Sequence, residues 1–126
     1  MDIRKMEKAA VAALEDIKAR DIVVLKVAHL SPLFERVIIA SADSTRQVKA
    51  LADNVREKLK ALGAPPLSME GEDSGEWVLV DLGPVVVHVM QPAVRQYYNL
   101  EELWDQPEPK RPRARKKDAE SRQAAG

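Results

Sequence analysis

The chain offers few side chains of the kinds that carry out acid–base, nucleophilic or metal chemistry. It has no cysteine and two histidines, His29 and His88, which lie on different predicted elements. His88 could exchange protons with Asp81 or Arg95 if these side chains met. It lies in a run of apolar residues, however, where a histidine more often makes a structural hydrogen bond or a contact with a partner. We therefore interpret His88 as structural or partner-facing and not as catalytic.

The acidic residues do not have the spacing of a metal site. Four carboxylates gather between residues 70 and 76, in the sequence Glu70-Gly71-Glu72-Asp73-Ser74-Gly75-Glu76. This spacing is not that of a calcium-binding loop, and neither histidine belongs to an H-x-x-x-H or D-x-D pattern. We interpret the segment as a solvated acidic turn, and we expect neither a metal nor another cofactor.

A phosphate-binding loop is not indicated either. Such a loop needs clustered glycines before a helix, so that backbone N–H groups can approach the phosphate. The five glycines of this chain are scattered, at positions 63, 71, 75, 83 and 126. The main predicted helix follows Ala42-Asp43-Ser44-Thr45, where Asp43 would repel a phosphate. The sequence therefore argues against a nucleotide site.

Length and composition predict a single soluble domain with an appendage. The chain has 126 residues, of which 45% are hydrophobic and 32% are charged. No apolar stretch approaches the roughly 20 residues that a membrane span needs. The N-terminal residues lack the apolar core of a signal peptide. We expect a cytoplasmic protein that has no contact with a membrane.

The net charge of zero hides an uneven distribution along the chain. Residues 106–126 contain seven basic and three acidic residues, giving +4, and residues 1–105 contain thirteen basic and seventeen acidic residues, giving −4. We predict a folded domain over residues 1–105 and a disordered basic tail over residues 106–126. A body that grips nucleic acid would usually be basic and not acidic.

The pattern of hydrophobic residues predicts an α/β fold. Ser44 and Gln47 match a helix-capping box, and Pro92 suits the first turn of a short helix. We predict helices over residues 3–19, 44–62 and from 92 onward, and strands over residues 22–27, 34–41, 67–70, 77–82 and 85–90. The expected architecture is a sandwich in which helices pack on a mixed sheet of about five strands.

Two details of the sheet follow from the strand sequences. The nearly continuous β-branched run 22–27 is typical of a strand that is covered on both faces. Too few residues separate the first two strands for a helical crossover, which favours an antiparallel pair. The tight connection between residues 82 and 85 predicts an antiparallel hairpin. The remaining strand order stays open.

Residues 76–104 contain both tryptophans and both tyrosines of the chain. Side chains alternate along a strand, so Val78 and Val80 share the face that suits the core. Trp77 and Leu79 point to the other face. They either complete the core or form a patch for a partner, and the sequence leaves both readings open.

The next strand and helix add candidates to the same region. His88 lies on one face of its strand with Val86 and Met90. Tyr97 and Tyr98 are adjacent on a short predicted helix, so both cannot face inward. We expect one of them to present its ring to solvent or to a partner.

Several short motifs follow one another between residues 3 and 104. They are Asp21-Ile22, Val37-Ile38-Ile39-Ala40, Ser44-x-Arg46-Gln47-Val48, Glu70-Gly71, Trp77-Val78-Leu79-Val80-Asp81-x-Gly83, Val86-Val87-His88-Val89 and Arg95-x-x-Tyr98-x-Leu100-Glu101-x-Leu103-Trp104. Their order and spacing resemble those of the ribosomal silencing factor family, also called the Iojap family. The chain departs from the family pattern at Leu33-Phe34-Glu35-Arg36, at Met90 and at Ala93.

The resemblance implies a nucleotidyltransferase-like α/β fold without transferase activity. It also implies a function: binding to the large ribosomal subunit through ribosomal protein fourteen. Bound there, the factor would block the joining of the small subunit and damp translation when nutrients are short. A body charge of −4 suits a basic ribosomal protein better than it suits bare RNA.

The predicted docking patch comes from the last two strands and the helix after them. Its members are Trp77, Leu79, His88, Met90, Arg95 and Tyr98. Trp77 and Tyr98 would be the anchors, because large aromatic side chains dominate binding energy at interfaces. Arg95 and His88 would orient the partner by hydrogen bonding, and the acidic turn at 70–76 would steer its approach.

Three alternatives concern other activities and partners. The first is a residual nucleotide-binding or nucleotidyltransferase enzyme. The second is an RNA-binding module that acts through the basic residues 110–117. In the main hypothesis these residues add only a weak contact with ribosomal RNA. The third is a homodimer formed through the partly apolar face of the hairpin.

Overall fold

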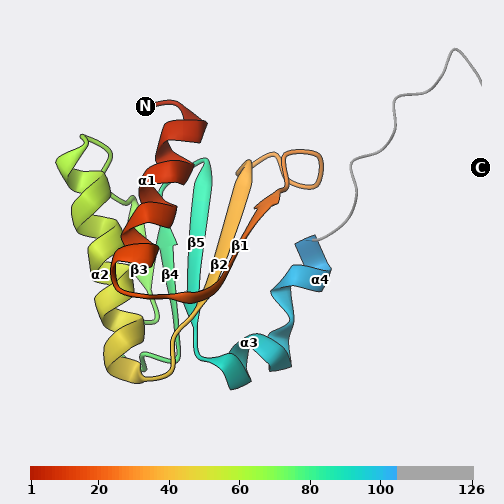
Figure 1. Cartoon of the computed structure of the whole chain (residues 1–126). Helices are drawn as coiled ribbons and strands as arrows, with labels where there is room; N and C mark the ends of the chain where they lie inside the picture. The colour runs from red at the N-terminus through yellow and green to blue at the C-terminus, as the bar shows by residue number, and fades with distance from the viewer. Residues whose placement is uncertain (105–126) are drawn as a thin grey trace, which may run out of the picture.

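In a computed structural model, residues 1–104 are described, and they form an α/β sandwich (Figure 1). The elements in chain order are α1 (Ile3–Asp16), β1 (Arg20–Lys26), β2 (Arg36–Ser41), α2 (Thr45–Ala61), β3 (Ser68–Glu70), β4 (Trp77–Asp81), β5 (Val85–Met90), α3 (Pro92–Tyr98) and α4 (Leu100–Trp104). The predicted fold class is confirmed. The predicted basic tail, residues 106–126, lies outside the described residues.

The five strands form one mixed sheet in the order β1-β2-β5-β4-β3. β2 and β5 are parallel, and the other three neighbouring pairs are antiparallel. The prediction of an antiparallel first pair and of a β4–β5 hairpin is therefore confirmed. The parallel pairing places β5 at the centre of the sheet, between β2 and β4.

The prediction for the first strand is wrong in one respect. β1 is an edge strand, and its residues Ile22 to Leu25 are only partly buried. The strands that are covered on both faces are β2 and β5, in which most side chains are buried. A run of β-branched residues suits either position, because strand order decides how much of a strand is covered.

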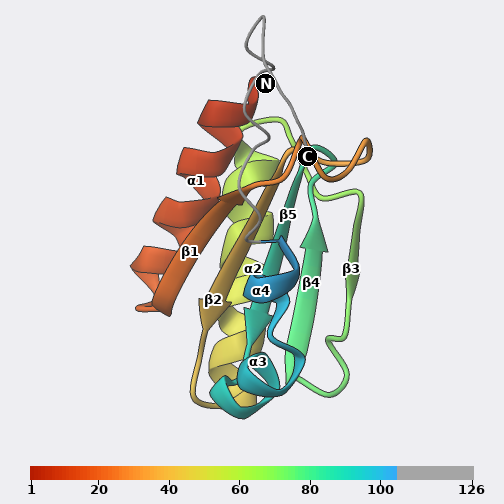
Figure 2. The same ribbon diagram turned by 90° about the vertical axis from the view of Figure 1, so that its right-hand side faces the viewer.

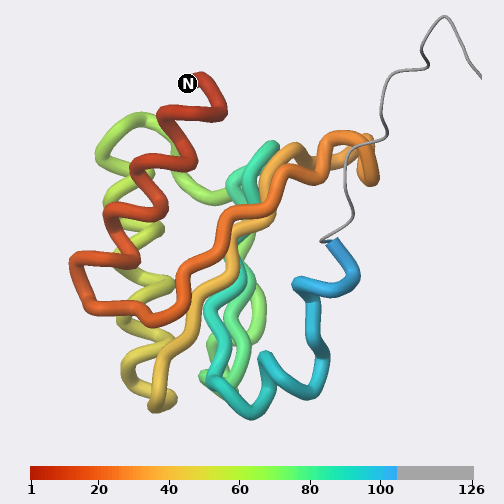
Figure 3. Tube along the Cα trace, turned by 45° about the vertical axis from the view of Figure 1, so that its right-hand side comes forward, coloured from red at the N-terminus to blue at the C-terminus, as the bar shows by residue number. Residues whose placement is uncertain are grey.

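α1 and α2 cover one face of the sheet, as Figures 1 and 3 show. Their apolar stripes pack against Ile38, Val78, Val80, Val87 and Val89 in the larger hydrophobic core. α2 begins as predicted, because the Ser44 hydroxyl accepts a hydrogen bond of 3.1 Å from the backbone N–H of Gln47. No helix within residues 1–104 combines the length and the apolar character that crossing a bilayer would take.

α3 and α4 lie on the opposite face of the sheet (Figure 3). The sequence predicted one short helix here, but Asn99 adopts a left-handed conformation with φ 48° and ends α3. α4 then turns back along the sheet, where Leu100 and Trp104 pack against Val37, Ile39 and Met90 in a second hydrophobic cluster. This arrangement leaves part of β4 and β5 uncovered.

Candidate partner-binding surface

The uncovered part of the sheet carries three of the six side chains that the sequence predicted for docking, namely Trp77, Leu79 and His88. In the β4–β5 hairpin, Trp77 pairs with Met90 and Leu79 pairs with His88 across the two strands. These residues face away from α1 and α2, because Val78 and Val80 occupy the larger core. Figure 2 views this face, with α4 in front of the sheet and β4 and β3 beside it.

Three rings form a connected aromatic surface, which comprises Trp77, His88 and Tyr98. The indole Nε1–H of Trp77 donates a hydrogen bond of 3.0 Å to Nδ1 of His88. The centroids of the Trp77 and Tyr98 rings are 4.9 Å apart, a spacing typical of favourable ring contacts. Tyr98 is 55% exposed, so the aromatic surface faces solvent on one side. The structure therefore brings these three predicted residues together.

Both tyrosines are exposed, where the sequence predicted that at least one would be. Tyr97 is more exposed than Tyr98 and meets it edge to face, at a centroid distance of 5.0 Å. Tyr98 lies between Tyr97 and Trp77, so it is the tyrosine that belongs to the aromatic surface.

His88 is held in the neutral form by its surroundings. Burial between Trp77 and the sheet lowers the pKa of His88 from 6.5 to about 4, since a charged imidazole would lose its hydration there. Because Nδ1 accepts the hydrogen bond from Trp77, the proton of the neutral ring lies on Nε2. At neutral pH the aromatic surface thus carries no charge from His88.

Arg95 connects α3, α4 and the sheet. Its Nε and Nη2 donate hydrogen bonds of 2.9 and 3.0 Å to the two carboxylate oxygens of Glu101, and its Nη1 donates one of 2.7 Å to the hydroxyl of Ser41. The hydrogen bonds from Arg95 lower the pKa of Glu101. Only 11% of the Arg95 side chain is exposed. Arg95 therefore fixes the two short helices on the sheet, and three of its five N–H groups donate within the chain.

Met90 is fully buried in the second hydrophobic cluster. It was predicted as a member of the docking patch, but its side chain has no surface to offer. The physical reason is that α3 and α4 fold back over the end of β5, which the strand pattern alone does not reveal. Leu79, by contrast, keeps part of its surface exposed.

The acidic turn 70–76 sets the position of Trp77. Gly71 has φ +89°, and a side chain at this position would collide with the backbone carbonyl of Trp77. The backbone carbonyl of Gly71 accepts a hydrogen bond of 3.2 Å from the backbone N–H of Gly75, which closes the turn just before β4. Within residues 1–104, no group of three or more histidines or carboxylates converges on a point where a metal could bind.

A groove of about 520 Å³ adjoins the aromatic surface. Its walls are mostly apolar side chains from α4, from the β1–β2 loop, from the residue before β3 and from β4, namely Leu33, Phe34, Leu67, Leu79, Leu103 and Trp104. Val86, His88 and Asp81 also line it. The edge-to-face contact between Phe34 and Trp104, with a centroid distance of 5.3 Å, joins two of the walls. We call this feature the sheet groove.

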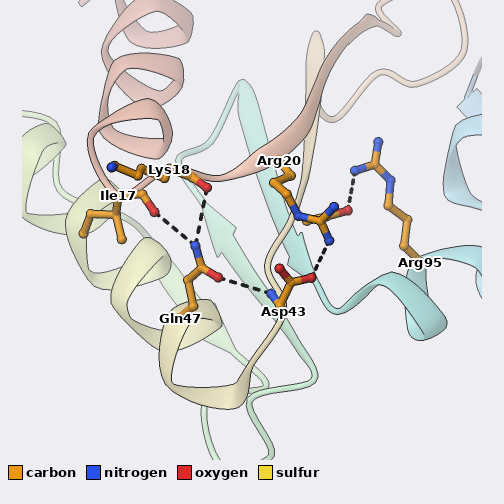
Figure 4. Close-up of polar contacts among 7 residues, drawn as sticks. Ile17, Lys18, Arg20, Asp43, Gln47 and Arg95 are labelled. Atoms are coloured by element: carbon orange, nitrogen blue, oxygen red, sulfur yellow. Dashed lines mark hydrogen bonds and ion pairs between the residues drawn. The ribbon is translucent and has the colours of Figure 1, made fainter.

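The N-terminus of α2 is filled by the protein itself, as Figure 4 shows. The side-chain amide of Gln47 donates to the backbone carbonyls of Ile17 and Lys18, at 3.1 and 3.4 Å, and its oxygen accepts from the backbone N–H of Asp43. Asp43 also forms an ion pair with Arg20. These contacts use the backbone N–H of Asp43 and hold its carboxylate at this helix end, where it would repel a phosphate.

Comparison with known proteins decides which family this fold and surface represent. A family model described as "Ribosomal silencing factor during starvation" matches residues 1–126. The chain belongs to the ribosomal silencing factor family. The match confirms the resemblance that the sequence motifs indicated.

Two relatives and one solved structure support the assignment. Ribosomal silencing factors of Chromobacterium violaceum and Bacillus subtilis are 57% and 40% identical to this chain over 104 residues. Both alignments cover 82% of this chain, and they cover 85% and 88% of the relatives. A crystal structure of a Chromobacterium violaceum protein superposes with a TM-score of 0.82 at 55% identity, over 87% of this chain and 92% of that one.

Sequence reasoning missed one feature of this silencing factor's surface. The sheet groove depends on Leu33, Leu67 and Leu103, which come from three separate segments. A signal was present, since each is a large apolar residue beside prolines or polar residues, outside a regular apolar pattern. That signal could not show that the three side chains meet.

Proposed function

We propose that this silencing factor binds the large ribosomal subunit through ribosomal protein fourteen and thereby blocks the joining of the small subunit. It would act in the cytoplasm, repress translation when nutrients are short, and do so without catalysing a reaction. The effect is steric: a folded body held at the subunit interface occupies the space that the small subunit needs.

The aromatic surface of Trp77, His88 and Tyr98 is the observation that carries this proposal. Tyr98 is exposed, Trp77 and His88 are partly exposed, and the surface carries no charge from His88 at neutral pH; aromatic residues of this kind are the usual energetic centres of protein interfaces. Arg95 holds the helix that bears Tyr98 in place, so little order has to be gained on binding.

The distribution of charge supports a basic partner. Residues 61–94, which contain β3, β4 and β5, include five carboxylates and no lysine or arginine. Ribosomal proteins are commonly basic, and complementary charge speeds association and excludes wrong partners. The proposed partner therefore fits the end of the sheet where the aromatic surface lies.

Co-sedimentation with separated ribosomal subunits tests the proposal. We expect the protein to travel with large subunits and not with small subunits. A protein that binds both equally, or neither, contradicts the proposal.

Deleting residues 106–126 separates the folded surface from the basic tail. We expect the truncated protein to bind large subunits within about two-fold of the full chain at roughly 150 mM salt, because screening weakens non-specific contacts with RNA. At roughly 50 mM salt the truncated protein should bind several-fold more weakly. If association disappears with the tail at both salt concentrations, the tail and not the folded surface is the binding element.

A further inference from the structure

The sheet groove has more volume and more apolar surface than one aromatic ring of a partner would fill. Leu33, Leu67 and Leu103, on separate walls, are 79%, 75% and 58% exposed. Apolar side chains that gather around a hollow at the surface are typical of a binding groove. The volume of about 520 Å³ suits several side chains of an inserted segment.

Asp81 supplies a charged group in this otherwise apolar groove. Its Oδ1 accepts a hydrogen bond of 2.8 Å from the backbone N–H of Gly83, which fixes the carboxylate at the β4–β5 turn. The structure shows no bond for its second oxygen among residues 1–104, and Asp81 is partly buried. A carboxylate held in this way can accept a hydrogen bond from a lysine or arginine side chain of a bound segment and form an ion pair with it.

The surroundings of the groove select for a basic occupant. The residues from 61 to 94 include no lysine or arginine, and Asp81 is, besides the neutral His88, the one acidic or basic side chain among the described residues that line the groove. A segment that entered with an acidic side chain near Asp81 would meet a like charge there.

We infer that the sheet groove binds a basic segment of the ribosomal partner that inserts an apolar side chain between Leu33 and Leu103 and pairs a lysine or arginine with Asp81. The inference rests on the proposed function and specifies it. The aromatic surface then anchors the partner. The groove next to it determines which side chains of the partner's segment can bind.

Two other occupants fit the groove less well. Residues 106–126 of this chain are basic, but they contain no large apolar side chain to fill the hollow. A second copy of the chain would bring another body of charge −4 against an acidic surface, which costs electrostatic free energy.

The test is a binding titration with isolated large ribosomal subunits. Asp81→Asn keeps an oxygen that accepts from Gly83 N–H and removes only the charge, so the turn is preserved. We expect it to weaken binding by roughly five- to ten-fold and to reduce the dependence of binding on salt. Leu33→Ala combined with Leu103→Ala should weaken binding about ten-fold or more.

Matched controls lie on the opposite side of the molecule. Glu15→Gln removes one charge from α1, and Leu62→Ala truncates a leucine that is 52% exposed after α2. Both should bind like the wild type. Circular dichroism and thermal unfolding would verify that all variants fold.

The outcomes separate the groove from the proposed function. If the wild type does not bind large subunits, the proposed function fails. If the wild type binds and both groove variants bind equally well, the groove inference alone is overturned. It is also overturned if deleting residues 106–126 strengthens binding several-fold, or if the groove variants convert a dimer to a monomer, because the occupant is then the tail or a second copy.

Discussion

Replacing both Trp77 and Tyr98 by alanine is expected to lower the affinity for the large ribosomal subunit by about 100-fold or more. Trp77 is half-buried and Tyr98 is 55% exposed, and both are large aromatic residues of the kind that forms interface hot spots, each typically contributing at least about 2 kcal/mol. The rings touch one another, so their effects will not simply add. A titration of labelled protein with purified large subunits measures the change.

Tyr97→Ala is the matched control for this double variant. Tyr97 is 82% exposed and lies on the far side of Tyr98 from Trp77, so its loss should change affinity by less than the loss of Tyr98. Trp77 also packs against the second hydrophobic cluster, so thermal unfolding must accompany the titration. A folded double variant that binds like the wild type would show that the aromatic surface is not the docking site.

Acidification is expected to destabilise the protein through His88. The pKa of His88 is lowered to about 4 in the folded state from 6.5 in the unfolded state. Above pH 6.5 both states hold a neutral imidazole, and the contribution of this group to stability is complete. Between pH 6.5 and 4 the unfolded state takes up the proton first, so the free energy of unfolding falls.

The expected loss between neutral pH and about pH 5 is roughly 2 kcal/mol, since each unit of pKa shift corresponds to about 1.4 kcal/mol. Chemical denaturation at a series of pH values measures it. The comparison should end near pH 5, because Glu101, whose pKa is lowered by Arg95, contributes its own change at lower pH.

His88→Gln isolates the contribution of this group. Glutamine does not titrate, and its side-chain oxygen can still accept a hydrogen bond from Trp77. We expect the variant to lose most of the decline in stability between pH 6.5 and 5. His29→Gln, at the other histidine, should retain it. An equal decline in His88→Gln and in the wild type would mean that other groups cause it.

Local sequence signals were sufficient for most of the fold. The cap at Ser44, the alternation in β4 and the tight turn before Val85 each depend on residues a few positions apart, and the structure confirms all three. The parallel pairing of β2 with β5, which leaves β1 at the edge of the sheet, joins residues 49 positions apart, such as Arg36 and Val85. No local pattern encodes such a choice, so the strand order stayed open.

The candidate site was predictable only where it depends on residues close together in the sequence. Alternation placed Trp77 and His88 on one face, but it could not show that the indole donates to the imidazole. Nor could it show that Arg95 is used by Glu101 and Ser41, or that Met90 is buried under α3 and α4. These outcomes depend on how α4 folds back after Asn99.

The central claim is that the bound protein prevents the two ribosomal subunits from joining. The most direct test is light scattering. Large subunits are first incubated with a saturating amount of the protein, and small subunits are then added. The account predicts that the rise in scattering is largely abolished, and that the Trp77→Ala, Tyr98→Ala double variant restores it. Normal joining while the protein remains bound to the large subunit would contradict the account.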